Sequence, residues 1–157
     1  MVLNVERRHN RIVLKGRCHH KEARCAVALK PGMDISFNAD LDVQPSVLTR
    51  ANALKHGFKI AKEDGLQSHS IRGTGYQGET YQPDDPVFYY IPNSGDEINI
   101  LVKDGEVITK GDGLVPEGGG TGLWIKAAGT ESRIPFIALE TRSPVGENDL
   151  VASEYQS

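Results

Sequence analysis

The stretch that decides the fold is Leu29-Lys30-Pro31-Gly32-Met33-Asp34-Ile35, because a close variant of it returns at Ile108-Thr109-Lys110-Gly111-Asp112-Gly113-Leu114. Each copy leads through a polar stretch to a second apolar segment. These segments are Phe58-Lys59-Ile60-Ala61-Lys62-Glu63-Asp64 and Pro135-Phe136-Ile137-Ala138-Leu139-Glu140-Thr141. Two copies are too few for a solenoid, which needs about three repeats to bury a continuous core. The sequence therefore predicts a duplicated β unit that closes on itself as a small barrel.

The segment between the two copies carries the clearest hairpin pattern of the chain. A run at 98–102 is followed by the turn dipeptide Asp104-Gly105 and by a second apolar run at 106–109. An Asp-Gly pair between two such runs is typical of a tight β-hairpin. The one expected helix is 45–56, with Ser46 as its cap and Gly57 at its end. Further short strands are expected at 12–14, 33–37, 87–91, 113–115, 122–127 and 134–140.

Length and composition agree with one mainly β domain. The chain has 157 residues, of which 17 are Gly and 8 are Pro, a balance that suits short strands joined by tight turns. We expect an N-terminal arm at 1–11, a single β-barrel domain at 12–142 and a C-terminal tail at 143–157. Because the arm has no turn residues and few apolar ones, we expect it to become ordered only when the protein docks on a partner.

Charge and hydropathy disfavour several classes of partner. The net charge is −3 and the chain has no basic stripe, which argues against a duplex nucleic-acid binder. No apolar run approaches the roughly 18 residues that span a bilayer, and the N-terminus lacks the apolar core of a signal peptide. Two cysteines are too few for a disulfide framework and fit a reducing compartment. We therefore expect synthesis in a cytoplasm, with no nucleic-acid or membrane partner.

The sharpest chemical candidate is Cys18-His19-His20 together with Cys25. Thiolate and imidazole are the ligands that zinc prefers. Adjacent residues on an extended chain point to opposite faces, however, and structural zinc sites space their ligand pairs by two to four residues. The spacing therefore favours a polar turn with two buried or half-buried thiols over a metal site.

Patterns that accompany catalysis are incomplete in this chain. The loop at 118–122 is rich in Gly but is followed by an expected strand, whereas a phosphate loop needs a Lys and a helix N-terminus. Ser68-His69-Ser70 places a base beside a nucleophile only in sequence, and the Gly-x-Ser-x-Gly elbow is missing. The pairs Asp84-Asp85 and Asp96-Glu97 lie at expected strand-opening turns, where acidic residues are common. We expect neither an enzyme nor a cofactor.

Three aromatic residues are candidates for a contact surface. Tyr89 and Tyr90 are neighbours on an expected strand, so one faces inward and the other outward. Trp124 follows a Gly-rich stretch and is the expected anchor of an interface, because Trp is enriched in binding hot spots.

Several motifs occur in an order that resembles a known family. They are the stretch 29–35, Asp84-Asp85-Pro86-Val87-Phe88-Tyr89, Pro92-Asn93-Ser94-Gly95-Asp96-Glu97-Ile98, and Lys110-Gly111-Asp112-Gly113-Leu114 followed by Phe136-Ile137-Ala138-Leu139-Glu140. Their order resembles that of the head decoration (cement) and capsid-stabilising proteins of tailed bacteriophages, over roughly residues 26–142. The Cys-His stretch 17–25 and the Gly/Tyr segment 67–82 depart from that pattern.

The resemblance implies a small β-barrel of the β-tulip type that forms a homotrimer. It implies a virion protein on the outer capsid surface, which binds the major capsid protein at three-fold or quasi-three-fold sites and bridges neighbouring capsomers. A protein with this task needs complementary surfaces rather than a reactive pocket. The residues expected at the capsid or subunit interface are Val2, Leu3, Val5, Arg7, Arg8, Arg11, Tyr89, Tyr90 and Trp124.

Other classes remain open at this point. A carbohydrate- or host-surface-binding module would gather Tyr89 or Tyr90 with Trp124 and Asp or Asn in one concave patch. A small-barrel enzyme would bring His19, His20, His56 or His69 together with carboxylates in a pocket. A single-strand nucleic-acid binder would need basic residues beside the aromatic ones, and Tyr89-Tyr90 lack them.

Overall fold

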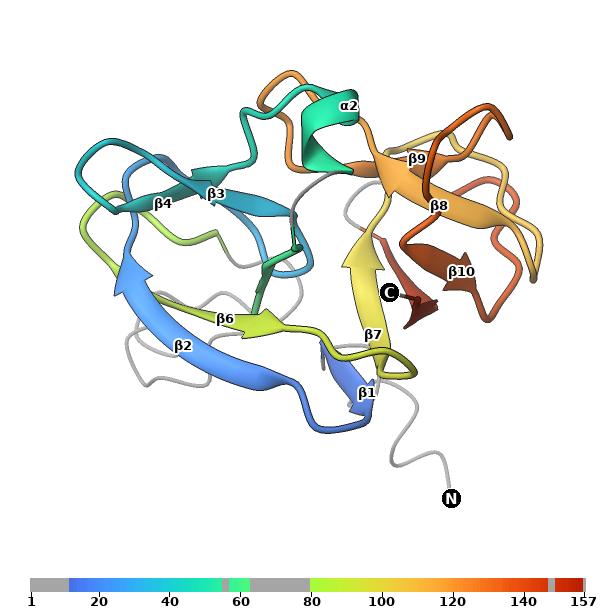
Figure 1. Ribbon diagram of the computed structural model, residues 1–157, viewed down its shortest axis with the longest axis horizontal. Coiled ribbons are helices and arrows are strands. Elements are labelled where there is room, and N and C mark those ends of the chain that lie inside the picture. Colours follow the sequence, from blue (N-terminus) through green and yellow to red (C-terminus); the bar gives the residue numbers. More distant parts are fainter. Residues whose placement is uncertain (1–11, 55–56, 63–79, 147–148, 157) are drawn as a thin grey trace.

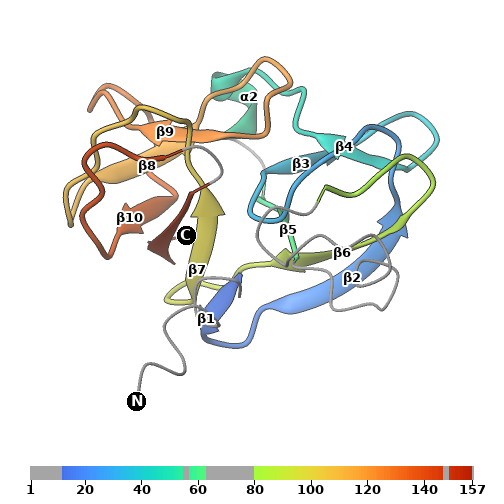
Figure 2. The same ribbon diagram turned by 180° about the vertical axis from the view of Figure 1, so that it is seen from behind.

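Two β units lie side by side in the computed structural model, which describes residues 12–54, 57–62, 80–146 and 149–156. Figure 1 shows the first unit, which contains β2 to β6, on the left and the second unit, which contains β7 to β11, on the right. Figure 2 shows the same two units from behind, with β5 of the first unit in view. The duplication predicted from the sequence is thus visible as two neighbouring bodies.

The first unit is built from short strands between residues 19 and 91. A three-stranded sheet has the order β2-β6-β5, and a hairpin pairs β3 with β4. An antiparallel bridge between Asp34 and Ile60 joins the start of β3 to β5. The strands are β2 (His19–Arg24), β3 (Ile35–Phe37), β4 (Val43–Pro45), β5 (Ile60–Ala61) and β6 (Pro86–Ile91).

The second unit has the same connections in one six-stranded sheet of order β1-β7-β11-β10-β8-β9. The five strand ladders of this sheet are antiparallel. The strands are β1 (Val13–Lys15), which precedes the first unit in the chain, β7 (Glu97–Leu101), β8 (Gly113–Pro116), β9 (Trp124–Lys126), β10 (Phe136–Ala138) and β11 (Leu150–Tyr155).

The two units share their register as well as their strand order. Asp34 pairs with Ile60 in the first unit as Gly113 pairs with Ile137 in the second. The N–H of Gly32 donates to the carbonyl of Ala61 at 2.9 Å, and that of Gly111 donates to Ala138 at 2.8 Å. Both glycines have a positive φ, 87° and 96°, which explains why each copy of the motif contains Gly there. The internal repeat predicted from the sequence is therefore present in the strand pairing.

The expected closed barrel is corrected by the structure. Among the described residues of each unit, only one isolated parallel bridge links the end of the first strand to the second strand of the hairpin, Cys25 with Val43 and Val102 with Trp124. A single bridge is not a ladder, so the units remain open arrangements of antiparallel sheets.

The expected hairpin at 98–109 is also wrong, although its turn is present. Both edges of β7 are already used, by β1 on one side and by β11 on the other. The segment after the turn pairs elsewhere, because Ile108 and Arg142 exchange two backbone hydrogen bonds of 2.8 Å. The turn at Asp104-Gly105 therefore forms without a hairpin, because the residues on its two sides pair with segments that are more distant in the sequence.

Two further expectations change. Within the described part of 45–56 the expected helix is reduced to the single turn α2 (Arg50–Ala53), because Val43–Pro45 forms β4; residues 55–56 lie outside the described residues. The expected tail at 143–157 contains β11, which lies between β7 and β10. Leu150, Val151 and Tyr155 are buried there, so this segment supplies core side chains. No described helix has the length and hydropathy of a membrane-spanning one.

The structure has two apolar cores, a smaller one in the first unit and a larger one mainly in the second unit, to which Leu54, Phe58 and Ile60 of the first unit also contribute. In the larger core Trp124 packs on Phe136 at 4.9 Å between ring centroids and on Phe58 at 5.4 Å. The smaller core gathers Cys25, Leu29, Ile35, Val43, Ala61, Tyr81, Val87 and Tyr89.

Backbone hydrogen bonds join the two units where glycines allow close approach. The N–H of Leu101 donates to the carbonyl of Gly32 at 3.0 Å, and the N–H of Asp34 donates to that of Gly122 at 2.9 Å. A Cβ on Gly32 would lie 2.9 Å from the nitrogen of Leu101, and one on Gly122 would lie 3.0 Å from the carbonyl oxygen of Asp34. The two glycines therefore fix how closely the units can pack.

Candidate interface surfaces

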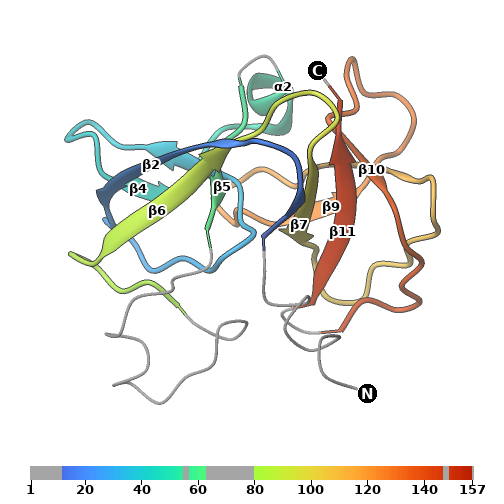
Figure 3. The same cartoon turned by 90° about the horizontal axis from the view of Figure 1, so that it is seen from below.

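The outer edge of β2 is the first candidate surface. In the second unit the equivalent strand β7 is covered by β1, where Asn99 N–H donates to the Ile12 carbonyl at 2.6 Å. Within the described residues β2 pairs along its length only with β6, and β2 lies at the margin of the first unit (Figure 3). The alternation of an antiparallel ladder turns the N–H and C=O groups of His20, Glu22 and Arg24 away from β6. An edge of this kind is a template for another chain, and the charged side chains on it limit unspecific pairing.

An aromatic strip runs beside this edge. Tyr90 is half-buried on β6, and the ring of His20 lies 6.4 Å from its ring. The ammonium of Lys62 lies 5.6 Å from the centre of the Tyr90 ring and 5.9 Å from that of Phe88. A half-exposed aromatic pair with a cation over it resembles the composition of protein interfaces, which are enriched in aromatic residues.

At the far end of β2 the surface becomes acidic around one arginine. Arg24 binds the carboxylate of Asp42 through Nε at 3.1 Å and Nη2 at 2.7 Å, and Asp84 lies 3.8 Å from Nη1. These carboxylates raise the pKa of Arg24, with the Asp42 hydrogen bond as the largest cause. A shallow, open hollow lies here, lined by Glu22, Ala23, Arg24, Asp84 and Pro86.

The turn between β3 and β4 presents an unusual residue beside this hollow. Leu41 is 74% exposed and has a φ of 64°, a conformation that bulky side chains rarely adopt. The Asn38 side-chain oxygen holds the turn by accepting the N–H groups of Asp40 and Asp42, both at 2.9 Å. A rigid turn thus exposes a large apolar side chain.

The structure separates the aromatic residues that the sequence placed at an interface. Tyr90 lies on the aromatic strip. Tyr89 is 5% exposed, so it belongs to the core of the first unit, and Trp124 is fully buried in the second. The expectation that Tyr89 and Trp124 contact a partner is therefore corrected. Burial of Trp124 also removes it from the exposed patch that a carbohydrate-binding module would need.

The remaining predicted interface residues belong to the N-terminal arm. Val2, Leu3, Val5, Arg7, Arg8 and Arg11 lie outside the described residues.

The two cysteines have different neighbours. The Cys18 thiol donates to Asp96 Oδ2 at 3.0 Å, and burial together with this carboxylate raises the thiol pKa to about 12. The Cys25 thiol donates to the Val27 carbonyl at 3.2 Å, and burial raises its pKa to about 11. Both thiols are therefore protonated at neutral pH, a form that is a poor nucleophile and a poor metal ligand. No group of three metal-ligating side chains occurs among the described residues.

Two carboxylates with clear roles were not singled out for these roles by the sequence. Asp96 accepts hydrogen bonds from the backbone N–H groups of Arg17 at 3.1 Å and Asn93 at 2.8 Å, and so ties the segment before β2 to the segment before β7. Asp34 is buried where the units meet, and burial raises its pKa to about 7, against the opposing effects of Ser46 and Lys59. A carboxylate directly before an apolar strand was the only available signal for Asp34.

Comparison with known proteins gives a likeness of fold. No protein-family model matches the chain, and no curated protein sequence matches it. Among solved structures it is similar to the crystal structure of the head fiber gp8.5 N base in bacteriophage phi29, with a TM-score of 0.56. The match covers 89% of this chain and 95% of the other, with 13% sequence identity. At this identity the likeness concerns the fold.

Proposed function

We propose that this chain is a structural protein of a tailed-phage virion, which binds the outer surface of the capsid as a homotrimer and stabilises the head. The observation that carries the proposal is the fold likeness to the base of a phage head fiber, which extends over 89% of the chain. The motif order over residues 26–142, which resembles that of capsid decoration proteins, supports the same assignment independently.

The surface chemistry is compatible with such a role. The described residues offer an unpaired strand edge, an aromatic strip and an acidic end on the first unit. Surfaces of this kind support recognition of a protein partner through main-chain hydrogen bonds and aromatic contacts. The proposed role requires no catalysis and no cofactor.

The finer parts of the proposal concern geometry on the shell. The trimer would occupy three-fold or quasi-three-fold positions and contact the major capsid protein of neighbouring capsomers. The N-terminal arm, residues 1–11, would add contacts to the shell. Its three Arg residues and its apolar Val2, Leu3 and Val5 suit both charged and strand-like contacts.

Binding to heads tests the proposal directly. Purified protein is added to heads of the encoding phage that were assembled without it, and bound protein is measured by co-sedimentation. We expect saturable binding, with bound protein at three-fold or quasi-three-fold positions in cryo-electron microscopy and a trimeric mass by light scattering.

A variant lacking residues 1–11 should bind heads more weakly while its thermal unfolding is unchanged. Unfolding of that variant would show that the arm belongs to the core. A wild-type protein that fails to bind heads at micromolar concentration, but binds glycans on an array, would replace this function with surface adhesion.

A further inference from the structure

The contact between the two units inside one chain is one-directional. The second unit contributes the N–H of Leu101 and the carbonyl of Gly122, which we call its edge surface. The first unit contributes the carbonyl of Gly32 and the N–H of Asp34, which we call its glycine surface. If the units were related by a two-fold axis, the reverse pair of contacts would also be present. Within the described residues it is absent, so the contact is head-to-tail.

Each unit therefore has one surface equivalent to a half of this contact to which no described residue is bonded in the same way. The register makes Arg24 and Leu41 of the first unit equivalent to Leu101 and Gly122 of the second. The turn residues Leu41 and Gly122 even share their backbone conformation, with φ values of 64° and 67°. Arg24 and Leu41 thus form an edge surface on the first unit, and no described residue bonds to the N–H of Arg24 or the carbonyl of Leu41.

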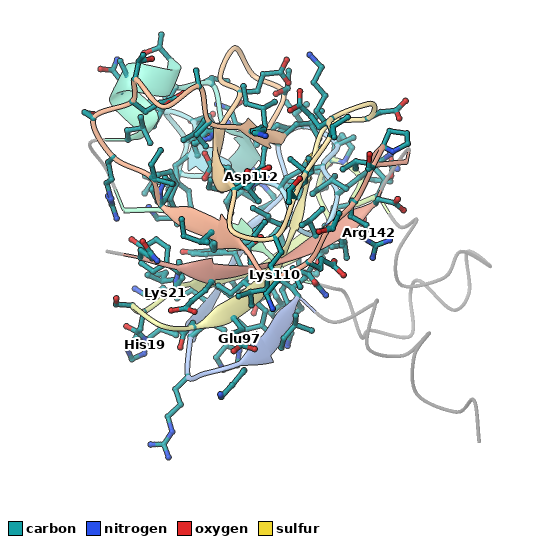
Figure 4. The ribbon with its side chains drawn as sticks, turned by 90° about the vertical axis from the view of Figure 1, so that its right-hand side faces the viewer. His19, Lys21, Glu97, Lys110, Asp112 and Arg142 are labelled. Carbon is teal, nitrogen blue, oxygen red and sulfur yellow. The ribbon has the colours of Figure 1, made fainter. Side chains whose placement is uncertain are left out.

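The unused glycine surface lies on the second unit. Gly111 is equivalent to Gly32 and Gly113 to Asp34. A Cβ built on Gly32 would collide with Leu101 of the neighbouring unit, whereas one on Gly111 would meet no atom within 4 Å. Gly111 therefore keeps the open approach that Gly32 uses, with nothing seated on it among the described residues. Figure 4 looks onto this part of the second unit, where Lys110, Asp112 and Arg142 are labelled.

The two unused surfaces have opposite charge. Asp40, Asp42 and Asp84 surround the single Arg24 on the first unit. On the second unit Lys110 and Lys126 are exposed beside Gly111, and Lys126 forms an ion pair of 2.9 Å with Asp112. An acidic surface and a basic surface on one molecule favour association of identical copies and fix its direction.

We propose that copies of this chain associate head-to-tail. Arg24 and Leu41 on the first unit of one copy contact Gly111 and Gly113 on the second unit of the next. The contact would reproduce the one between units of a single chain, and three chains would close a ring of six units. This inference rests on the homotrimer of the proposed function and names the surfaces that form it.

One difference between the two contacts follows from Leu41. A Cβ built on Gly122 would lie 3.2 Å from the Cβ atoms of Met33 and Pro45, a distance that leaves no room for a larger side chain. The intermolecular contact must therefore be wider than the intramolecular one, with the leucine side chain in the gap. This accounts for a bulky, 74% exposed residue in a left-handed turn, where glycine would be less strained.

Disulfide trapping tests the direction of the contact. The full chain, with Cys18 and Cys25 replaced by Ser, is prepared as Leu41→Cys, as Lys110→Cys and as the double variant, each checked by circular dichroism and light scattering. After mild oxidation, the double variant should give covalent dimers and trimers on a non-reducing gel. Each single variant should stay monomeric on the gel. In a head-to-tail ring the same residue of two neighbouring chains is too far apart to form a disulfide. The matched control is Leu41→Cys with Ser94→Cys, which places the second thiol at an exposed turn away from Gly111.

The outcomes separate this inference from the function on which it rests. A trimeric wild type with no cross-linking of the double variant overturns the head-to-tail contact and leaves the trimer standing. Dimers from Leu41→Cys alone would show a two-fold contact and overturn it as well. A wild type that is monomeric both in solution and on heads overturns the trimer together with this inference.

Discussion

The two units share one scheme of strand pairing, but their side chains differ in how they pack and in which strand edges they leave exposed. The second unit buries Trp124 and Phe136 and has β7 covered by β1. The first unit has Val43 at the position of Trp124, and within the described residues the outer edge of β2 is open. Equal backbone hydrogen bonding thus coexists with a heavy, enclosed core in one unit and a lighter core with exposed edges in the other. The scheme of strand pairing specifies the fold of both units. The side chains determine that the second unit contributes more of the stability and that the first unit offers the surface for contacts with a partner.

The largest difference between the units should appear when equivalent core residues are truncated. Trp124→Ala removes a fully buried ring that packs on Phe58 and Phe136, and should lower the free energy of unfolding by about 3–5 kcal/mol. Val43→Ala at the equivalent position should cost about 2 kcal/mol. Urea unfolding followed by far-ultraviolet circular dichroism measures both. Equal losses would show that the two cores carry equal weight.

The covered and the open edge strand should respond differently to proline. Asn99→Pro in β7 loses the 2.6 Å hydrogen bond to Ile12 and a buried side chain, and should destabilise the protein by about 3 kcal/mol. Glu22→Pro in β2 removes an N–H that faces away from β6, and should cost less than about 1 kcal/mol. Thermal unfolding of the two variants compares them. A Glu22→Pro protein as unstable as Asn99→Pro would mean that the edge of β2 is covered.

Substitution of the two equivalent glycines, Gly32 and Gly111, distinguishes the cost of backbone strain from the cost of a steric clash between the units. Gly32→Ala introduces a Cβ at a φ of 87° that also collides with Leu150 and Leu101, so we expect a loss of about 2–3 kcal/mol. Gly111→Ala has a similar φ of 96° but open space, so only strain of about 1 kcal/mol remains. Chemical denaturation gives both values, and their difference measures the contact between the units. Similar losses would imply that this contact is weak.

The sequence was sufficient for the features that local chemistry determines. The repeated Gly32 and Gly111 motifs predicted the duplication, because a positive φ before a short strand leaves a visible pattern. The strands around Phe88 and Phe136 were found from their β-branched and aromatic composition. Of the three aromatic residues that the sequence places at an interface, only Tyr90 lies on the candidate surface. The burial of Tyr89 and Trp124 depends on which face of a strand meets another layer, and the local sequence does not determine that.

Long-range pairing was beyond local reasoning. The turn at Asp104-Gly105 predicted a hairpin. In the structure, however, β7 pairs with β1 and β11, and Ile108 in the segment 106–109 pairs with Arg142. Leu150 to Tyr155 looked like a tail because one short alternating segment near a terminus does not reveal that β7 and β10 leave a place between them. The open edge of β2 follows from the same pairing choices and had no sequence signal of its own.

The smallest expected effect concerns pH and distinguishes the glycine surfaces of the two units. Asp34 has a pKa of about 7 in the folded protein against 3.8 for the unfolded chain, while the equivalent Gly113 cannot titrate. The folded state holds this proton more tightly, so the contribution of Asp34 to stability is fully present below about pH 4 and is lost as the pH rises through about 7. Asp34→Asn removes this dependence and, at pH 8, should stabilise the protein by about 1–2 kcal/mol.

Other carboxylates titrate in the opposite direction, as Asp112 does with its lowered pKa, so the informative quantity is the difference between variant and wild type at each pH. That difference should grow between about pH 4 and 7 and then level off. A constant difference would show that Asp34 stays ionised and that the contact between the units tolerates a buried charge. In that case the presence of Asp34 in the first unit and of Gly113 at the equivalent position of the second would have no electrostatic consequence. The two glycine surfaces would then differ only in the space that they leave for a partner.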